Sequence, residues 1–573
     1  MHNGVFKSLY LFVLLLAMVA CNKNPATLFT KVSKDNTYID FSNNLKETSK
    51  MNILTYSYFY HGGGVAVGDI NNDGLQDLLF SGNMVPNKLY LNKGNFKFED
   101  ISGSAGIAEK KGWFTGVTMT DINADGKMDF YICSSDPDPE RRKNLLFINQ
   151  GMTRDNKPYF KEEASEYGLD DKGFSTQAAF FDYDKDGDLD MCLINRSPHQ
   201  YTTGLQENPE IRKRKKPAFS NKLFRNEKGH FIDVSAEAGI TSNVLTVSLA
   251  VAIADINKDG WLDIYISNDF NEPDYLFINN HHGSFDEKLS GYMDQVSMYS
   301  MGSDIADFNN DELPDLITLD MLSEDNRGQK MHSGAENFDK IQEFFRKGFF
   351  YQFSRNMLQK NNGDGTFSEI GQLAGVSNTD WSWASLFSDF DNDGNKDLFI
   401  SNGYVKDLTD LDFLKYTANQ VVRTEGKNMN LAVNDLIGRM PKIELPNYIY
   451  QNRGDGTFTK RTSEWGMDDR GASSGSAYVD LDNDGDLDLV INNTNDYAGV
   501  YKNNSELLNK NNYLRIKLQG DAANALGIGT KVTLFCKGDR YYQEQMPVRG
   551  FQSSVDPVLN FGVGKHTEID SVS

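Results

Sequence analysis

Acidic residues recur along this 573-residue chain at spacings that suit a hard metal ion. A nine-residue pattern, D-x-[DN]-x-D-G-x-x-D, is repeated in seven loops, the fifth with one substitution, which begin at Asp69, Asp121, Asp182, Asp255, Asp307, Asp389 and Asp480. Oxygen ligands at positions 1, 3, 5 and 9 can surround one ion, and a glycine at position 6 allows the sharp turn. Calcium takes six to eight oxygen ligands in flexible geometry, whereas softer transition metals prefer Cys and His. The pattern therefore predicts calcium-binding loops.

The predicted calcium ligands are the side chains at positions 1, 3, 5 and 9 of each loop. They are Asp69, Asn71, Asp73 and Asp77; Asp121, Asn123, Asp125 and Asp129; Asp182, Asp184, Asp186 and Asp190; Asp255, Asn257, Asp259 and Asp263; Asp307, Asn309, Asp311 and Asp315; Asp389, Asp391, Asp393 and Asp397; Asp480, Asp482, Asp484 and Asp488. In the fifth loop Glu312 replaces the glycine and Pro314 precedes the last aspartate. A β-carbon at positive φ costs about 1 kcal/mol or more. We expect up to seven calcium ions, with the site at Asp307 the weakest.

An EF-hand is one alternative interpretation of these loops, and a simple hydrophilic turn is another. An EF-hand needs flanking helices and a bidentate Glu at position 12. Here position 12 is Phe80 in the first loop and Leu193 in the third, and short apolar runs typical of strands flank the first loop at 65–67 and 78–80. A single acidic turn needs no metal, but seven copies in one register favour a repeated binding site.

Each acidic loop belongs to a longer repeat with four strand-like segments. A strand rich in small residues enters the loop, as at 176–181, and a second strand leaves it, as at 189–193. A third strand follows, as at 221–226, and a Gly-containing hairpin leads to a fourth, as at 231–235. Four antiparallel strands in each of seven repeats predict an all-β fold, a seven-bladed β-propeller with calcium loops.

The two ends of the repeat region predict how the ring closes. The seventh repeat has its third strand near 500–503 but lacks a fourth strand after it. Residues 29–33 match the fourth strands at 231–235 and 98–102. An N-terminal strand that completes the last blade would remove two exposed sheet edges. We expect this closure.

The repeats resemble the FG-GAP or VCBS family of calcium-binding propellers, which also builds the head of integrin α-chains, and the resemblance covers residues 28–505. The following stretch contains Leu526-Gly-Ile-Gly-Thr-Lys-Val532, Arg549-Gly-Phe-Gln-Ser-Ser554 and Leu559-Asn-Phe-Gly-Val-Gly564. These motifs resemble the ASPIC/UnbV domain of bacterial, Bacteroidetes-type proteins and imply a small C-terminal β domain at 511–573. The family pattern continues past its final Gly with a Trp-Pro turn that is not seen here, so we expect a shortened domain or a fragment.

The N-terminal segment resembles a bacterial lipoprotein signal peptide over residues 1–21. Lys7 precedes an apolar run at 9–20, and Cys21 follows the run. The run is shorter than the roughly 20 residues that a transmembrane helix needs. By this resemblance Cys21 is the lipidated first residue of an exported chain that is tethered to a membrane, at the outer membrane or cell surface. The alternative is a cleaved secretory signal with an incidental Cys. The other three cysteines, Cys133, Cys192 and Cys536, are expected to be buried free thiols.

The charge of the chain limits its partners. It contains 81 Asp and Glu against 58 Lys and Arg, which gives a formal net charge of −23. A surface of this sign argues against a nucleic-acid partner. Much of the acidity belongs to the predicted calcium loops, so bound calcium would remove part of the self-repulsion.

Strand order predicts where a partner would bind. The calcium loops and the Gly-containing hairpins lie at one end of the blades, and the connections between second and third strands lie at the other. Three long insertions fall in the latter connections, at 197–220, 321–353 and 403–446. The first carries the basic run 212–216, and the third is expected to be helical. Loops on a rigid scaffold often carry recognition, although these insertions could instead only cover the channel or pack on a neighbouring domain.

Catalytic motifs give little support for an enzyme. The eight histidines are scattered, and the sequence has no H-E-x-x-H pair and no paired Cys motif. We therefore expect a non-enzymatic calcium-binding envelope lipoprotein, an adhesion or ligand-binding module for a glycan or a protein, contacted through the inserted loops. The alternative is a polysaccharide lyase or hydrolase built on the same propeller face.

Overall fold

The computed structural model describes residues 27–573, except 109, 199–208, 271, 333–337, 419 and 422–428. The predicted signal segment at 1–21, with Cys21, lies outside the described residues. Within the described part, no helix is both long enough and apolar enough to cross a membrane. Cys133, Cys192 and Cys536 are buried free thiols, as predicted.

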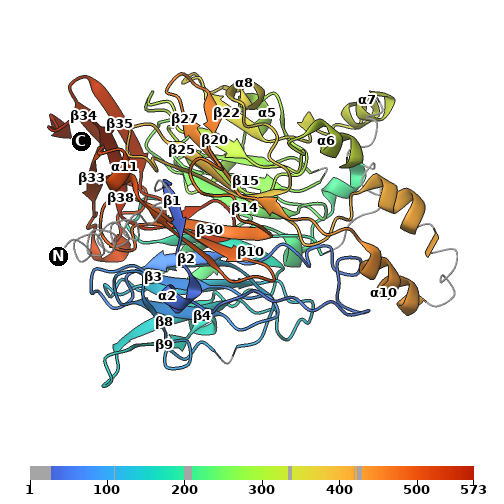
Figure 1. The fold of residues 1–573 in the computed structure, drawn as a ribbon, viewed down its shortest axis with the longest axis horizontal. Helices are drawn as coiled ribbons and strands as arrows, with labels where there is room; N and C mark the ends of the chain where they lie inside the picture. Colours follow the sequence, from blue (N-terminus) through green and yellow to red (C-terminus); the bar gives the residue numbers. More distant parts are fainter. Residues whose placement is uncertain are drawn as a thin grey trace, which may run out of the picture.

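Four-stranded antiparallel sheets are the repeating unit of the described chain, and we call them blades (Figure 1). In chain order of their loops, the blades consist of β2 (Val65–Gly68), β3 (Asp77–Phe80), β4 (Lys88–Asn92) and β5 (Phe98–Asp100); β6 (Phe114–Thr120), β7 (Asp129–Ser134), β8 (Leu145–Met152) and β9 (Pro158–Glu162); β10 (Ser175–Phe181), β11 (Asp190–Asn195), β12 (Lys222–Asn226) and β13 (Phe231–Asp233); β14 (Ser248–Ala254), β15 (Asp263–Asn268), β16 (Tyr275–Asn279) and β17 (Phe285–Glu287); β19 (Ser303–Ala306), β20 (Asp315–Thr318), β22 (Met357–Asn361) and β23 (Phe367–Glu369); β24 (Ser382–Ser388), β25 (Asp397–Asn402), β27 (Tyr448–Asn452) and β28 (Phe458–Lys460); β30 (Ser473–Val479), β31 (Asp488–Asn493), β32 (Gly499–Asn503) and β1 (Phe29–Lys31).

The first strands of the blades form a closed ring. Strands β2, β6, β10, β14, β19, β24 and β30 contact one another in this order, and β30 contacts β2. Small residues allow the close approach, because a β-carbon at Gly302 would lie 1.9 Å from the Trp383 carbonyl oxygen of the next blade. The prediction of an all-β propeller is confirmed.

The N-terminal strand completes the last blade, as predicted. Strand β1 pairs antiparallel with β32, with Phe29 opposite Asn503 and Lys31 opposite Tyr501. Phe29 has no solvent exposure, and its ring lies 5.6 Å from that of Phe390 in the preceding blade. The ring is therefore closed by residues at least 470 positions apart in sequence.

The C-terminal residues form a small β domain on one end of the propeller (Figure 1). It contains β33 (Asn512–Ile516) paired with β38 (Leu559–Gly564), and a second sheet of β34 (Lys531–Cys536), β35 (Asp539–Glu544) and β39 (Ser571–Val572). The helices α6 (Asn326–His332), α7 (Phe338–Arg346) and α10 (Met429–Arg439) extend from the other end.

Short elements complete the described chain. They are α2 (Lys34–Thr37), α3 (Ala164–Tyr167), α5 (Leu289–Tyr292), α8 (Gly371–Ala374), α11 (Ser505–Leu508), η1 (Pro209–Lys213), η2 (Pro217–Phe219), the π-helix η3 (Phe413–Ala418), η4 (Ala522–Asn524), β18 (Val296–Ser297), β21 (Gln352–Phe353), β26 (Leu445–Pro446) and β29 (Arg470–Gly471). Elements η3 and α10 confirm that the third insertion is helical.

A segment of the C-terminal domain fills the centre of the ring, which the sequence did not indicate. Its short strands β36 (Val548–Arg549) and β37 (Ser553–Ser554) contact the first strands of six blades, namely β2, β6, β10, β14, β19 and β30. The Gln552 carbonyl oxygen accepts a hydrogen bond from the Val117 N–H at 3.0 Å. The Phe551 ring is fully buried, 5.1 Å from that of Trp383. We call residues 545–556 the axial segment.

The third insertion covers the opposite end of the channel. Phe413 and Met440 pack in the same apolar cluster as Phe551, Trp383 and Tyr404. This insertion therefore covers the channel, which is one of the roles that the sequence left open for the insertions.

The closing strand should contribute strongly to stability. Phe29→Ala removes a fully buried ring and should lower the free energy of unfolding by about 3–5 kcal/mol. Chemical denaturation of the whole chain measures this loss, with Tyr38→Ala, at a ring that is 60% exposed, as the matched control. Equal stability of the two variants would contradict the closure.

The axial segment should depend on one buried ion pair. Arg549 donates to both carboxylate oxygens of Asp304, at 2.7 and 2.8 Å. Arg549→Met leaves Asp304 buried and uncompensated and should cost about 3–5 kcal/mol. Adding Asp304→Asn removes the charge and should restore part of this loss in thermal denaturation. Losses that simply add in the double variant would show that the two groups are not coupled.

Candidate metal centre

Each acidic loop joins the first and second strands of a blade and is shaped by its own aspartates. At position 1, the Asp69 carboxylate accepts hydrogen bonds from the N–H groups of Asp73 (3.0 Å) and Gly74 (2.8 Å). The same two bonds recur in the second, fourth, fifth, sixth and seventh loops. They hold the loop closed, with position 6 in the left-handed region, for example at φ 87° for Gly74.

The position 9 aspartate is buried in every loop. Its two oxygens accept one N–H from the third strand and one from position 2, as at Asp190, which binds Asn226 N–H at 2.8 Å and Tyr183 N–H at 3.2 Å. Burial raises the pKa of Asp190 to about 9 and that of Asp129 to about 7. A cation in the loop would offset this cost of burying a negative charge.

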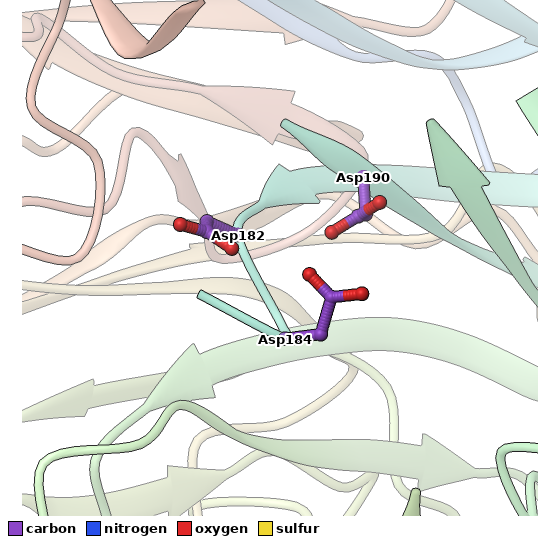
Figure 2. A group of neighbouring side chains, drawn as sticks. All are labelled: Asp182, Asp184 and Asp190. Atoms are coloured by element: carbon purple, nitrogen blue, oxygen red, sulfur yellow. The ribbon is translucent and has the colours of Figure 1, made fainter. Parts of the chain in front are cut away.

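The predicted ligands converge in four loops. In the third loop, oxygen atoms of Asp182, Asp184 and Asp190 lie within 4.8 Å of one another (Figure 2). One oxygen each of Asp182 and Asp184 is buried without a hydrogen-bond partner. The other three groups are Asp307, Asp311 and Asp315; Asp389, Asp391 and Asp397; Asp480, Asp482 and Asp488. Several aspartate clusters of this chain can therefore hold a metal ion.

The first, second, fourth and fifth loops have an asparagine at position 3. In the first, the Asn71 amide oxygen accepts the Asp73 N–H at 3.3 Å, and its nitrogen donates to the Asp73 carboxylate at 2.9 Å. The Asp73 carboxylate also accepts the N–H of Leu75 at position 7 (2.9 Å). In the first loop the side chains at positions 3 and 5 therefore contact each other, whereas the aspartates of the first, second and fourth loops do not converge as closely as those of the four loops above within the described residues.

The fifth loop keeps its shape despite its substitution. Glu312 has φ 68°, in the left-handed region, and its N–H donates to Asp307 at 3.0 Å, as the glycine does in other loops. The strain predicted from the sequence is therefore present in the backbone. The calcium affinity of this loop remains a prediction.

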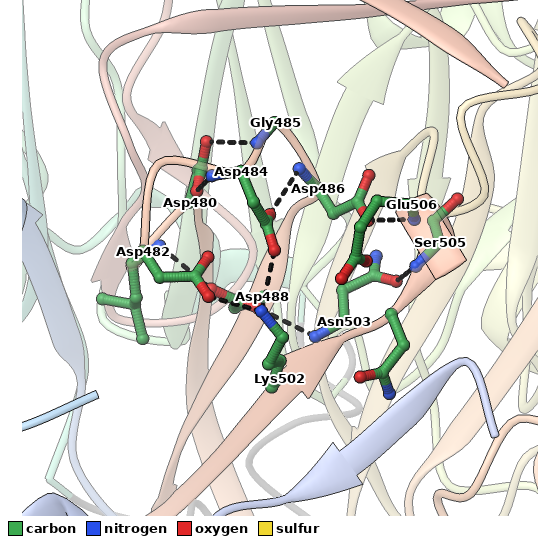
Figure 3. Close-up of polar contacts among 12 residues, drawn as sticks. Asp480, Asp482, Asp484, Gly485, Asp486, Asp488, Lys502, Asn503, Ser505 and Glu506 are labelled. Atoms are coloured by element: carbon green, nitrogen blue, oxygen red, sulfur yellow. Dashed lines mark hydrogen bonds and ion pairs between the residues drawn. The ribbon is translucent and has the colours of Figure 1, made fainter. Parts of the chain in front are cut away.

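The seventh loop contains groups that sequence reasoning missed. Lys502 contacts the carboxylates of both Asp482 and Asp484 (Figure 3). Glu506 on α11 forms a second carboxylate group with Asp484 and Asp486. Asp486 stands at position 7, where a backbone carbonyl is the usual ligand, so the nine-residue pattern does not select it. Glu506 follows the third strand and carries no spacing signal.

An asparagine at the end of the third strand connects neighbouring loops, and this role was also missed. The Asn279 N–H donates to Asp263 at 2.8 Å, and its side-chain nitrogen donates to the Tyr183 carbonyl oxygen in the preceding loop at 2.8 Å. Both bonds are also made by Asn92, Asn149, Asn361, Asn452 and Asn503, and the backbone bond by Asn226. Their recurrence at one register of the repeat was the available signal.

The C-terminal domain packs directly on the acidic loops. Lys531 contacts the Asp255 carboxylate, and Arg515 contacts that of Asp480 at 2.7 Å. The Asn560 side chain donates to the Gly485 carbonyl oxygen at 3.2 Å. This end of the propeller is therefore partly covered by basic and polar groups of the same chain.

Comparisons with known proteins agree with this architecture. Cartilage acidic protein 1 from mouse is 22% identical over 525 residues, covering 88% of this chain and 68% of the relative. The human protein is 23% identical over 525 residues, covering 88% and 67%. A solved structure described as an Agrocybe aegerita protein recognising non-reducing terminal N-acetylglucosamine is 14% identical, covers 73% of this chain and 87% of its own, and has a TM-score of 0.36, too low to support an argument.

Family models match two parts of the chain. The FG-GAP-like repeat matches residues 69–132, 255–318, 349–400 and 433–491, which contain six of the seven acidic loops. The ASPIC and UnbV model matches residues 520–573. This chain carries FG-GAP-like repeats in a β-propeller followed by an ASPIC and UnbV segment.

Proposed function

We propose that this chain is a calcium-stabilised β-propeller that serves as a non-enzymatic adhesion or ligand-binding module. The observation that carries the calcium assignment is the third loop, where three carboxylates lie within 4.8 Å and two of their oxygens are buried without partners. Oxygen ligands alone suit calcium better than a transition metal. The same loop design in every blade supports one role for all of them.

Calcium would act on the part of the fold that is hardest to stabilise. Each blade buries an aspartate at position 9, and burial raises the pKa of Asp263 and Asp315 to about 8. A divalent ion would stabilise the charged carboxylates and fix the turn between the first and second strands of each blade.

The proposed partner is a glycan or a protein that binds the end of the propeller bearing the insertions. Support comes from the C-terminal domain, which occupies the other end through residues such as Lys531 and Arg515. The basic run at 212–216 is partly used within the fold, because Arg212 pairs with the buried Glu272 at 2.9 Å. This engagement argues against a nucleic-acid site there.

A binding role is favoured over the lyase or hydrolase alternative. His61 lies 4.3 Å from the Tyr58 ring and 4.6 Å from the Trp383 ring, and burial lowers its pKa well below the ordinary value. His332 pairs with Asp407 at 2.8 Å. Both histidines therefore have structural contacts, and no observation favours a catalytic role for either.

The location proposed for this module is the outer membrane or cell surface. The support is the signal-like segment and Cys21, which would carry the lipid anchor. Export also suits the calcium sites, because extracellular calcium is abundant enough for weak, open loops.

Calcium should bind at several sites and stabilise the fold. We expect six or seven ions when chelator-stripped chain is titrated with Ca²⁺ by calorimetry, with a large rise in melting temperature. At 100 times its Kd, each ion adds about 2.7 kcal/mol. Mg²⁺ is the control and should stabilise less, because it demands stricter octahedral geometry. Two or fewer sites, or an unchanged melting temperature, would contradict the proposal.

The fifth loop should improve when its strain is removed. Glu312→Gly relieves a left-handed residue, so the calcium-free protein should gain roughly 0.5–1 kcal/mol after the entropy cost of glycine, and the loop should bind calcium more tightly. The lost ion pair with Arg540 is exposed and should matter little. Gly187→Ala is the opposite control and should lower stability through backbone strain alone. The φ of Gly187 is +98°, and no atom lies within 4 Å of the added carbon, so no steric clash contributes. A lower melting temperature for Glu312→Gly would disprove the strain argument.

A further inference from the structure

A polar groove of about 350 Å³ lies between the seventh and first blades. It is lined by residues 40–44, by the connection between β3 and β4, and by the connection between β31 and β32. Both connections join second to third strands, so the groove opens at the end away from the acidic loops. Its volume is in the range of small-molecule sites.

The walls of the groove are held in place by backbone contacts. Ser42 forms an antiparallel bridge with Tyr497, and Asn43 forms a bridge with Thr494. The Asn495 side-chain oxygen accepts the Leu45 N–H at 2.7 Å, which ties the two segments together. A ligand would therefore bind without much ordering of the protein, and this lowers the entropic cost of binding.

The groove combines an aromatic face with hydroxyl-binding groups. The Tyr497 ring is 44% exposed, and Phe41 is buried beside it. One oxygen of Asp40 accepts the Tyr90 hydroxyl at 2.7 Å, and one oxygen of Asp496 accepts the Tyr497 N–H at 2.7 Å. The second oxygen of each carboxylate has no bond of this kind in the described residues. A sugar ring presents C–H groups on its face and hydroxyl donors on its edge, which matches this arrangement.

The charges of the groove select against acidic ligands. Asp40 and Asp496 are part of its lining, and Lys88 is paired with Asp100 outside it. Lys34 lies over the Tyr497 ring, 4.9 Å from its centre, and already supplies a cation there. Asp40 and Asp496 would repel a phosphate or an acidic sugar, and any ligand that stacks on the face of Tyr497 under Lys34, sugar or basic peptide, would have to displace Lys34.

We propose that this groove binds a neutral carbohydrate, with Tyr497 as the stacking face and Asp40 and Asp496 as acceptors for sugar hydroxyls. The inference rests on the proposed ligand-binding function and names a ligand class and a place for it. None of the residues that line the groove belongs to the three long insertions.

The test uses the whole calcium-loaded chain on a microarray of neutral and acidic glycans, with a lysine-rich peptide as an additional probe. Neutral glycans that bind are then titrated by calorimetry. Tyr497→Ala should weaken binding about tenfold, at an unchanged melting temperature. Asp496→Asn should weaken it by a few fold. Tyr159→Ala is the matched control, because this ring has the same 44% exposure and lies on β9.

Three outcomes would overturn the inference. Neutral glycans that bind Tyr497→Ala as tightly as the parent chain would place the site elsewhere and leave the ligand-binding function intact. Binding of only acidic glycans or of the lysine-rich peptide would disprove the ligand class. Absence of glycan binding by a protein that still takes up calcium would disprove the groove assignment while the calcium proposal stands, so the two failures are distinguishable.

Discussion

The fold depends on burying one aspartate per blade next to a self-closing turn. At position 9 each carboxylate is removed from water and bonded to two backbone N–H groups, as for Asp190 with Asn226 and Tyr183. These bonds fix the start of the second strand and the end of the third. They leave a negative charge in a poorly solvated place, which costs free energy unless an opposite charge lies nearby. The other loop oxygens gather where such a charge would sit.

The same constraint explains the position of the C-terminal domain. The loop end of the propeller has an excess of carboxylates, and this domain brings Lys531 and Arg515 to two of them. Its axial segment supplies Arg549, which neutralises Asp304 on a first strand. Electrostatic compensation and the filling of the channel are therefore provided by one small domain. Its docking is part of the propeller's stability and not an attachment to a finished fold.

Periodic features could be predicted from sequence, and single contacts could not. The acidic loops, the strand repeat and the closing strand at 29–33 recur at a fixed period, so their geometry follows from comparing copies. The axial segment has no copy, and its partners, such as Val117 and Trp383, are more than 150 residues away in sequence. Lys502 and Glu506 were missed for a related reason, because only the three-dimensional pairing of strands places them beside the seventh loop.

The two ends of the propeller differ in how freely the sequence and length of their loops can vary. At the loop end, the aspartates at positions 1 and 9 bond to the backbone of their own blade, and the third-strand asparagine also bonds to the loop of the preceding blade, so a change in one loop loosens two blades. The connections between second and third strands differ widely in length, from the short turn at 82–87 to the insertion at 403–446. Both walls of the proposed sugar groove include connections of this kind. Recognition at this end can therefore change without disturbing the charge compensation that holds the ring together.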